Sequence, residues 1–268
     1  MTEIPNLNAR ELIEFYLDTG ADALLGEEPV DRFAAVEAPP VAPRQPSEKP
    51  AAAAPVTARA AAAPAVVAPD EAAMAARAAA KSAASLEELR AIVEGFEGCA
   101  LKATATRTVF ADGNPQARVM LVGEAPGRDE DIEGLPFVGR SGKLLDQMLK
   151  AIGLDRSSVY IANIVPWRPP GNRTPTPQES AICLPFILRQ IELADPDILV
   201  CLGGPSAQTL LNIKDGITKT RGKWFTFDTG KREIRAIATF HPAFLLRSPL
   251  QKRFAWRDLL AIKKALDG

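Results

Sequence analysis

The sequence predicts an α/β fold, a three-layer α/β/α sandwich with a mostly parallel central sheet. Three short apolar runs, at residues 119–122, 159–165 and 198–202, are typical of strands buried on both faces. A stretch with helical periodicity follows each run. Because strands that alternate with helices form parallel sheets covered on both sides, the pattern indicates this architecture.

Two regions precede the predicted folded domain. Residues 1–33 are acidic, and their apolar side chains recur at helical spacing over residues 8–25. Residues 34–84 are rich in alanine and proline, so they bury too little apolar surface to offset the entropy of ordering, and we expect a disordered linker. Within it, residues 70–81 are alanine-rich enough to form transient helix.

The predicted domain covers residues 85–268. Ser85 followed by Glu88 is a capping-box signature, so a helix should start there. Two further strands are expected at residues 224–227 and 233–239. Later helices are expected at residues 141–153, 176–193, 204–211 and 254–266.

Composition excludes several classes. The 268 residues carry a formal net charge of -1 and three cysteines, a sparse, odd set that favours a reducing compartment over a disulfide framework. No membrane span, secretory signal, phosphate-binding loop, serine-hydrolase elbow or Cys-x-x-Cys pair is present, and we expect a cytoplasmic protein. Residues 211–268 hold 13 basic and 5 acidic side chains, which indicates either a polyanion-binding surface or an ordinary solvated one.

Three unusual loops follow predicted strands, at residues 123–139, 166–173 and 241–247. Loops after parallel strands meet at one edge of the sheet, where ligands of open α/β folds bind. We therefore expect one pocket built from these three loops.

The first loop carries acids and an aromatic residue. Glu124 and Glu130 are suited to hold water or stabilise a cationic sugar, and Asp129 and Asp131 to do the same or coordinate magnesium. Acidic loops are also often merely solvated. Phe137 either stacks on a planar ligand or belongs to the core.

Two further residues are candidates for chemistry. His241, the only histidine, sits at a strand end, where it could donate to a developing anion or be structural. Asn163 lies in an apolar strand, and its amide either reads the edge of a pyrimidine or is a buried structural group.

A series of motifs, in order, resembles the uracil-DNA glycosylase superfamily, and most of all its iron–sulfur class, usually called family four. The resemblance covers residues 99–266. It rests on Gly-Glu-Ala-Pro-Gly at 123–127, Gly-Leu-Pro-Phe-Val-Gly-Arg-Ser-Gly at 134–142, Val-Tyr-Ile-Ala-Asn at 159–163, Arg-Pro-Pro-Gly-Asn-Arg at 168–173, Ile-Thr-Lys-Thr-Arg-Gly-Lys-Trp at 217–224 and His-Pro-Ala-Phe-Leu-Leu-Arg at 241–247.

The resemblance implies roles at the matching positions. Phe137 would stack on a uracil flipped out of DNA, Asn163 would pair with its polar edge, and His241 would donate to its O2. Glu124, with the main chain around Ala125, would line the pocket, and the carboxylate of Glu130 or of its neighbour Asp131 would position or activate water. Contacts to DNA would come from Arg140, Arg168, Arg173, Lys219, Arg221, Lys223, Leu245, Leu246 and Arg247.

The sequence departs from that class at its metal centre. The class binds a four-iron cluster through four cysteines, of which only Cys99 and Cys183 match; Phe96 and Trp167 stand at the other two positions. We expect no iron–sulfur cluster and no other metal, with the two aromatic side chains filling the space by packing. Cys201 lies on another strand.

The expected function is that of a monofunctional, monomeric uracil-DNA glycosylase acting in base excision repair on single- or double-stranded DNA. It would release free uracil and leave an abasic site, because residues 139–142 hold neither the insertion nor the histidine of the branch that bonds uracil covalently, and no lysine is placed for a lyase step. The alternatives are a protein that binds abasic or damaged DNA with weak catalysis, and a glycosylase for a wider range of deaminated bases.

Overall fold

The computed structural model describes residues 69–268. The acidic helix expected at residues 8–25 and most of the linker lie outside the described residues. Six strands form one sheet: β1 (Ala111–Gly113), β2 (Val119–Gly123), β3 (Tyr160–Asn163), β4 (Ile198–Leu202), β5 (Trp224–Asp228) and β6 (Glu233–Thr239).

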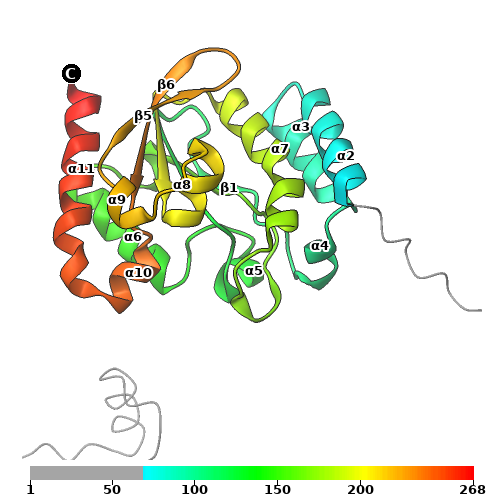
Figure 1. Ribbon diagram of the computed structural model, residues 1–268, viewed down its shortest axis with the longest axis horizontal. Helices are drawn as coiled ribbons and strands as arrows, with labels where there is room; N and C mark the ends of the chain where they lie inside the picture. Colours follow the sequence, from blue (N-terminus) through cyan, green and yellow to red (C-terminus); the bar gives the residue numbers. More distant parts are fainter. Residues whose placement is uncertain (1–68) are drawn as a thin grey trace, which may run out of the picture. The chain divides into compact units, whose positions relative to one another are not determined.

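The strand order is β1-β3-β2-β4-β6-β5. Figure 1 shows α2, α3 and α7 on one side of the molecule and α11 on the other. The four inner strands, β3, β2, β4 and β6, run parallel, and the two edge strands pair antiparallel with their neighbours. The apolar runs therefore became the buried inner strands, and the predicted fold class is confirmed.

Helices cover both faces of this sheet. Their bounds are α2 (Pro69–Ser82), α3 (Leu86–Gly95), α4 (Ala100–Thr104), α5 (Arg128–Glu133), α6 (Arg140–Ala151), α7 (Pro177–Ala194), α8 (Gly204–Leu211), α9 (Ile217–Thr220), α10 (Pro242–Arg247) and α11 (Lys252–Asp267), with short 3-10 turns η1 (Arg156–Ser158), η2 (Pro170–Asn172) and η3 (Pro249–Gln251). Among residues 69–268, no helix is both long and apolar enough to cross a membrane.

Alternate side chains of each inner strand face opposite layers. On β2, Met120 and Val122 join the core beneath α2, α3, α7 and α8. Their neighbours Val119 and Leu121 join the core beneath α6, α10 and α11. Every residue of β2 is buried, which explains why the strand reads as an uninterrupted apolar run.

Helix α2 corrects the expected boundary at Ser85. Ala72, Ala76 and Ala80 are buried in the core beneath α7, and Arg189 of α7 donates to the carbonyl of Ala83 at 2.6 Å. Alanines four residues apart form one smooth helix face, which lets two helices approach closely. The sequence placed these residues in the linker as transient helix, whereas α2 begins at Pro69 and its buried face begins at Ala72.

Two short helices replace parts of the predicted loops. Helix α5 begins at Arg128 after the extended Gly127, inside the acidic loop, and α10 begins with Pro242 directly after His241. Proline at the first helical position suits a helix start because its missing N–H has no partner there anyway. Strand β3 ends at Asn163, earlier than expected.

Candidate active site

The carboxyl ends of the four inner strands meet at one edge of the sheet. Gly123 at the end of β2 pairs in register with Asn163 at the end of β3. The amide of Gly203, just after β4, donates to the carbonyl of Thr239 on β6 at 2.9 Å, two residues before His241. The loops after these strands line a pocket of about 550 Å³, as the parallel topology predicts.

Phe137 forms one wall of this pocket. Its ring is buried and lies 5.4 Å from the imidazole of His241, centroid to centroid, with 31° between the planes. A β-carbon at Gly123 would overlap both the Phe137 ring and the side-chain oxygen of Asn163, so only glycine lets these two side chains meet over the end of β2. Phe137, His241 and Asn163 thus line the same part of the pocket, and the aromatic ring of Phe137 suits a planar ligand.

Two buried oxygens in the pocket have no hydrogen-bond partner, Oδ1 of Asn163 and Oε1 of Glu124. Buried polar atoms are nearly always paired, because leaving one unpaired costs about 1–3 kcal/mol. Burial also raises the pKa of the Glu124 carboxyl group. These atoms therefore mark the polar contacts that a ligand would complete.

His241 is held in one tautomer. Its Nδ1 accepts a hydrogen bond from the amide of Ala243 at 3.1 Å, so the proton of the neutral ring sits on Nε2. Burial, with a smaller contribution from the nearby charge of Arg247, lowers the pKa of His241 to about 4. At neutral pH the side chain is thus an uncharged donor at the pocket.

Glu130 lines the pocket and organises the Phe137 loop. Its Oε1 accepts from the amides of Val138 and Gly139 at 3.1 and 3.0 Å, and its Oε2 accepts from the amide of Gly127 at 3.0 Å. The Oε2 atom thus makes one hydrogen bond and has a second lone pair.

Asp131 does not join the other predicted catalytic residues at the pocket. It accepts from the amide and hydroxyl of Thr106 at 2.7 and 2.9 Å and lies 3.9 Å from Arg168, and it does not line the pocket. Arg168 in turn donates to Asn172 at 2.7 Å, within the rigid loop after β3. Asp131 therefore anchors this loop region to the segment after α4.

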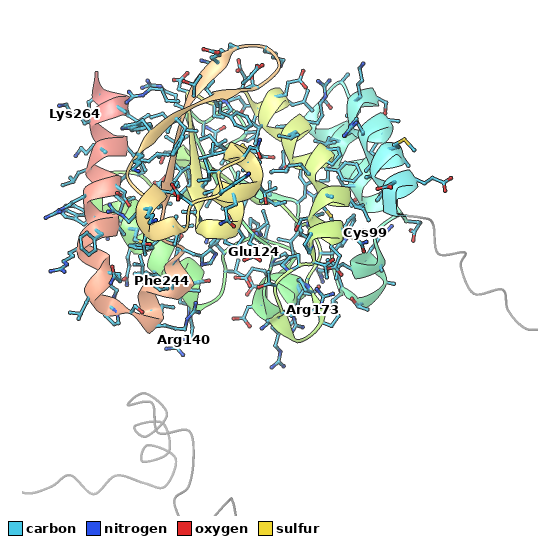
Figure 2. All side chains as sticks on the ribbon, viewed as in Figure 1. Cys99, Glu124, Arg140, Arg173, Phe244 and Lys264 are labelled. Atoms are coloured by element: carbon cyan, nitrogen blue, oxygen red, sulfur yellow. The ribbon has the colours of Figure 1, made fainter. Side chains whose placement is uncertain are left out.

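Arginines surround the mouth of the pocket. Arg173 and Arg247 line it, Arg173 while paired with Glu179 at 2.6 Å. Arg140 is exposed at the start of α6, and Figure 2 shows Arg140 and Arg173 below Glu124, one on each side of it. Arginines thus lie on both sides of the opening, with the charge of Arg173 paired to Glu179.

The segment 217–223 splits into exposed and buried positions. Lys219 and Lys223 are exposed, but Arg221 pairs with the buried Asp258 and donates to the carbonyl of Phe254 at 2.7 Å. Arg221 is only 15% exposed, so the structure places it as a link between the end of α9 and α11 instead of on the open surface.

Helix α10 presents only part of its predicted DNA-entering loop. Leu245 is buried in the core, while Leu246 is exposed. The apolar side chain available to a duplex is therefore Leu246, with Arg247 after it.

Sequence reasoning missed the fourth side of the pocket. Leu202, Gly203, Gly204 and Pro205 line it from the end of β4, and Phe244 lines it from α10. The signal was present, because Gly-Gly-Pro follows a parallel strand and so had to reach the same edge. Gly203 has a φ of +99°, and a β-carbon there would press against His241.

Comparison with known proteins identifies this arrangement. A sequence model described as the uracil DNA glycosylase superfamily matches residues 110–260, more than half of the chain. The chain belongs to the uracil-DNA glycosylase superfamily. Uracil-DNA glycosylases are hydrolases that act on N-glycosyl bonds.

Three members of the superfamily, each named a type-4 uracil-DNA glycosylase, are similar over most of their own length. The protein of Archaeoglobus fulgidus is 42% identical over 62% of this chain and 85% of its own, and that of Thermotoga maritima is 46% identical over 56% and 77%. The protein of Sulfurisphaera tokodaii is 40% identical over 67% and 84%. The recognised resemblance to family four is thereby confirmed.

The iron–sulfur cluster of this class does not fit the residues present. Trp167 is 1% exposed and donates from Nε1 to the hydroxyl of Thr108 at 3.1 Å, and Phe96 packs edge-on against Phe186 with 5.0 Å between centroids. Within residues 69–268, no three His, Cys, Asp or Glu side chains gather as metal ligands.

The two matching thiols lie in contact with each other. Cys99 and Cys183 are buried and hydrogen-bonded to one another, a contact that, with burial, raises the pKa of Cys183. Cys201 is buried on β4, where burial raises the pKa of its thiol to about 12. Two thiols and two aromatic rings cannot supply the four thiolates that such a cluster takes.

Proposed function

We propose that this protein removes uracil from DNA by flipping the nucleotide out of the strand and hydrolysing its N-glycosidic bond, leaving an abasic site. One observation carries the proposal: the unpaired Oδ1 of Asn163, the Phe137 ring and His241 come together in one pocket at the sheet edge. The names of its relatives, type-4 uracil-DNA glycosylases, support the same reading.

Recognition of the base rests on Phe137 and Asn163. The ring offers a flat apolar face, and aromatic side chains stack on bases that leave the helix. The Asn163 amide offers an acceptor and a donor side by side, which complement N3–H and O4 of uracil. Cytosine presents the opposite pattern at these atoms and would leave a buried polar group unpaired.

Departure of the base rests on His241. As the glycosidic bond breaks, negative charge develops on uracil O2, and a donor fixed near that oxygen stabilises it. The neutral imidazole with its proton on Nε2 is such a donor, because Nδ1 is occupied by the amide of Ala243. Held in a pocket of low polarity, it needs no rearrangement when the charge forms.

Water is held by carboxylates on the same loop. Glu124 brings an unpaired oxygen into the pocket, and Oε2 of Glu130 makes one backbone hydrogen bond and has a lone pair left for water. A carboxylate there also stabilises the cationic sugar electrostatically. Asp131 holds the loop region in place and does not line the pocket.

The strand itself is bound by the charged rim. Arg140, Arg173 and Arg247 at the mouth, with the exposed Lys219 and Lys223, contact phosphates on either side of the flipped nucleotide. The exposed Leu246 fills the space that the base leaves. Arg168 does not line the pocket and acts by holding the loop after β3 through Asn172.

We further infer that the protein is a monomer and binds neither an iron–sulfur cluster nor another metal.

The test uses the purified full chain and oligonucleotides with one uracil, single-stranded, opposite guanine or opposite adenine. We expect alkali-dependent strand cleavage at the uracil position, with the strand intact before alkali, and loss of cleavage with retained binding for Asn163→Asp and His241→Ala. Cleavage without alkali would contradict the monofunctional reaction. Tight binding of abasic DNA without any cleavage would instead favour the damaged-DNA binding alternative.

A further inference from the structure

Phe137 holds an unusual backbone conformation. Its φ is +55°, in the left-handed region that residues with a side chain rarely adopt. Such a conformation persists only where surrounding groups hold it in place. A β-carbon at Gly142 would overlap the Phe137 carbonyl, so the first turn of α6 presses directly on this peptide group.

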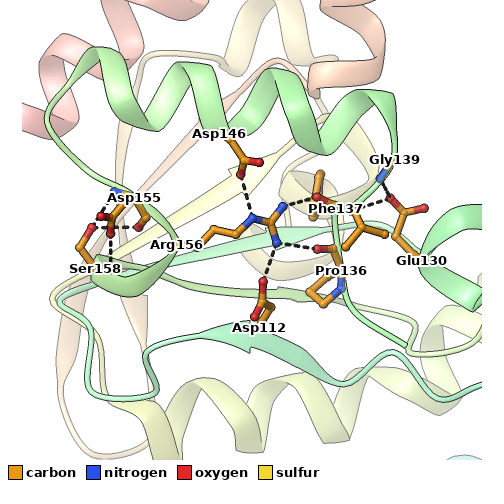
Figure 3. Close-up of polar contacts among 10 residues, drawn as sticks. Asp112, Glu130, Pro136, Phe137, Gly139, Asp146, Asp155, Arg156 and Ser158 are labelled. Atoms are coloured by element: carbon orange, nitrogen blue, oxygen red, sulfur yellow. Dashed lines mark hydrogen bonds and ion pairs between the residues drawn. The ribbon is translucent and has the colours of Figure 1, made fainter. Parts of the chain in front are cut away.

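Arg156 grips this peptide from the side away from the pocket. Its guanidinium donates to the carbonyl of Phe137 and, at 3.2 Å, to that of Pro136 (Figure 3). The same group pairs with Asp112 at 2.5 Å and Asp146 at 2.8 Å. A planar guanidinium has five donors in a fixed geometry, so carboxylates that orient it also aim its other donors at the two carbonyls.

Glu130 holds the following peptides from the other side. It accepts from the amides of Val138 and Gly139, directly after Phe137 (Figure 3). The carbonyls of residues 136 and 137 are thus held by a cation and the amides of residues 138 and 139 by an anion. Between them, Phe137 has little freedom to leave its left-handed conformation.

We propose that Arg156 is a positioning residue for base stacking, which holds the Phe137 backbone so that its ring stands as a platform in the pocket. Arg156 does not line the pocket, so it acts only through Phe137. The nature of the stacked base rests on the proposed function, whereas the positioning of Phe137 by Arg156 rests on geometry alone. The alternative is that Arg156 only links η1 to β1 and α6 by pairing with Asp112 and Asp146.

A double-mutant cycle separates these readings. We expect Arg156→Ala to lower single-turnover excision of uracil by about 10²-fold, the scale of a displaced active-site group. In a Phe137→Ala background the same change should lower it less than about 3-fold, because residues that act as one unit are not additive. Arg156→Lys, whose ammonium lacks the planar fork, should recover little activity. Equal losses in both backgrounds would overturn the proposal.

Arg232 provides a matched control. It also joins two carboxylates, Asp195 and Asp197, and two carbonyls, those of Asp195 and Pro196, but it lies outside the pocket lining. We expect Arg232→Ala to leave excision unchanged. A loss in this variant as large as that of Arg156→Ala would show that breaking any such network suffices.

The crystal structure of Arg156→Lys tests the mechanism independently of activity. We expect Phe137 to leave positive φ and its ring to move from its place 5.4 Å from His241. An unchanged φ and ring position would overturn the positioning role, even if the wild type excises uracil. Conversely, a displaced Phe137 in a protein that excises no uracil would support the positioning role and refute only the proposed substrate.

Discussion

The Nδ1 atom of His241 accepts a hydrogen bond from the amide of Ala243, at 3.1 Å. This contact exists because Pro242 starts α10 directly after His241, which turns the next amide back toward the imidazole. The histidine thereby caps its own helix, and Nε2 is the ring nitrogen left for the pocket that the residue lines. One ring nitrogen of His241 thus caps the helix, and the other is the proposed catalytic donor.

The pKa of about 4 for His241 predicts a clear titration. Because the chain has one histidine, its carbon-bound Hε1 proton gives one resolved NMR signal, which should titrate well below the usual value of about 6.5. Nitrogen shifts should show the Nε2–H tautomer from pH 6 to 8. A midpoint near 6.5 would contradict the half-buried, neutral donor.

The same shift makes folding stability depend on pH. The folded-state pKa lies below the unfolded value, so this contribution is complete above pH 6.5 and is lost as pH falls from 6.5 to about 4. Urea unfolding at pH 5 and 7.5 should therefore show a smaller pH effect for His241→Gln than for the wild type. Equal pH effects in both proteins would argue against the shift.

Glu124→Gln should stabilise the fold while lowering excision. Burial raises the pKa of the carboxyl group, so the ionised form at neutral pH costs stability, which an uncharged amide does not. We expect the Tm at pH 7 to rise, and the gain to shrink at pH 4, where the wild-type carboxyl group takes up a proton. Glu133→Gln, at an exposed acid of α5, is the control and should change neither property.

Substitutions at two arginines of the predicted DNA surface, Arg247 and Arg221, should have different effects, one on DNA affinity and the other on stability. Arg247→Ala removes a rim charge, so the slope of log affinity against log salt should fall by about 1, with little change in Tm. Arg221→Ala leaves the buried Asp258 unpaired and should lower the free energy of unfolding by about 3–5 kcal/mol without a change in slope. Filter binding across salt concentrations and urea unfolding measure the two effects. The reverse assignment would show that Arg221, not Arg247, contacts phosphate.

Trp167 should carry the stability that a metal centre would otherwise supply. It is buried to 1% exposure, and its loss leaves a large cavity, so Trp167→Ala should lower the free energy of unfolding by about 3–5 kcal/mol. The purified wild type should hold no stoichiometric iron or sulfide. Four irons per chain, together with a mild effect of Trp167→Ala, would contradict packing as the replacement.

Much of the fold followed from the sequence because its inner strands are buried on both faces and its loops obey sheet topology. Gly123, Asn163 and His241 were brought together by strand ends alone. The packed helix α2 was not predicted, because alanine contributes little to a hydrophobic pattern and because the burial of these alanines depends on the facing surface of α7.

Other features depend on partners that no local pattern shows. Arg221 matched a motif of basic residues, but Asp258, 37 positions later, takes its charge. Arg156 carries no signal in its own turn, since its partners are carbonyls of a loop about 20 residues earlier and carboxylates of two other elements. The left-handed conformation of Phe137 is likewise set by packing and not by residue type.

The amount of free uracil released from DNA tests the proposed glycosylase reaction without relying on strand cleavage alone. The full chain is incubated with a uracil-containing oligonucleotide, and free base and alkali-labile sites are counted in the same sample. We expect one free uracil per alkali-labile site and more than one turnover per enzyme molecule. We expect neither product with Asn163→Asp, or with cytosine in place of uracil. No free uracil from the folded wild type would contradict the proposed reaction.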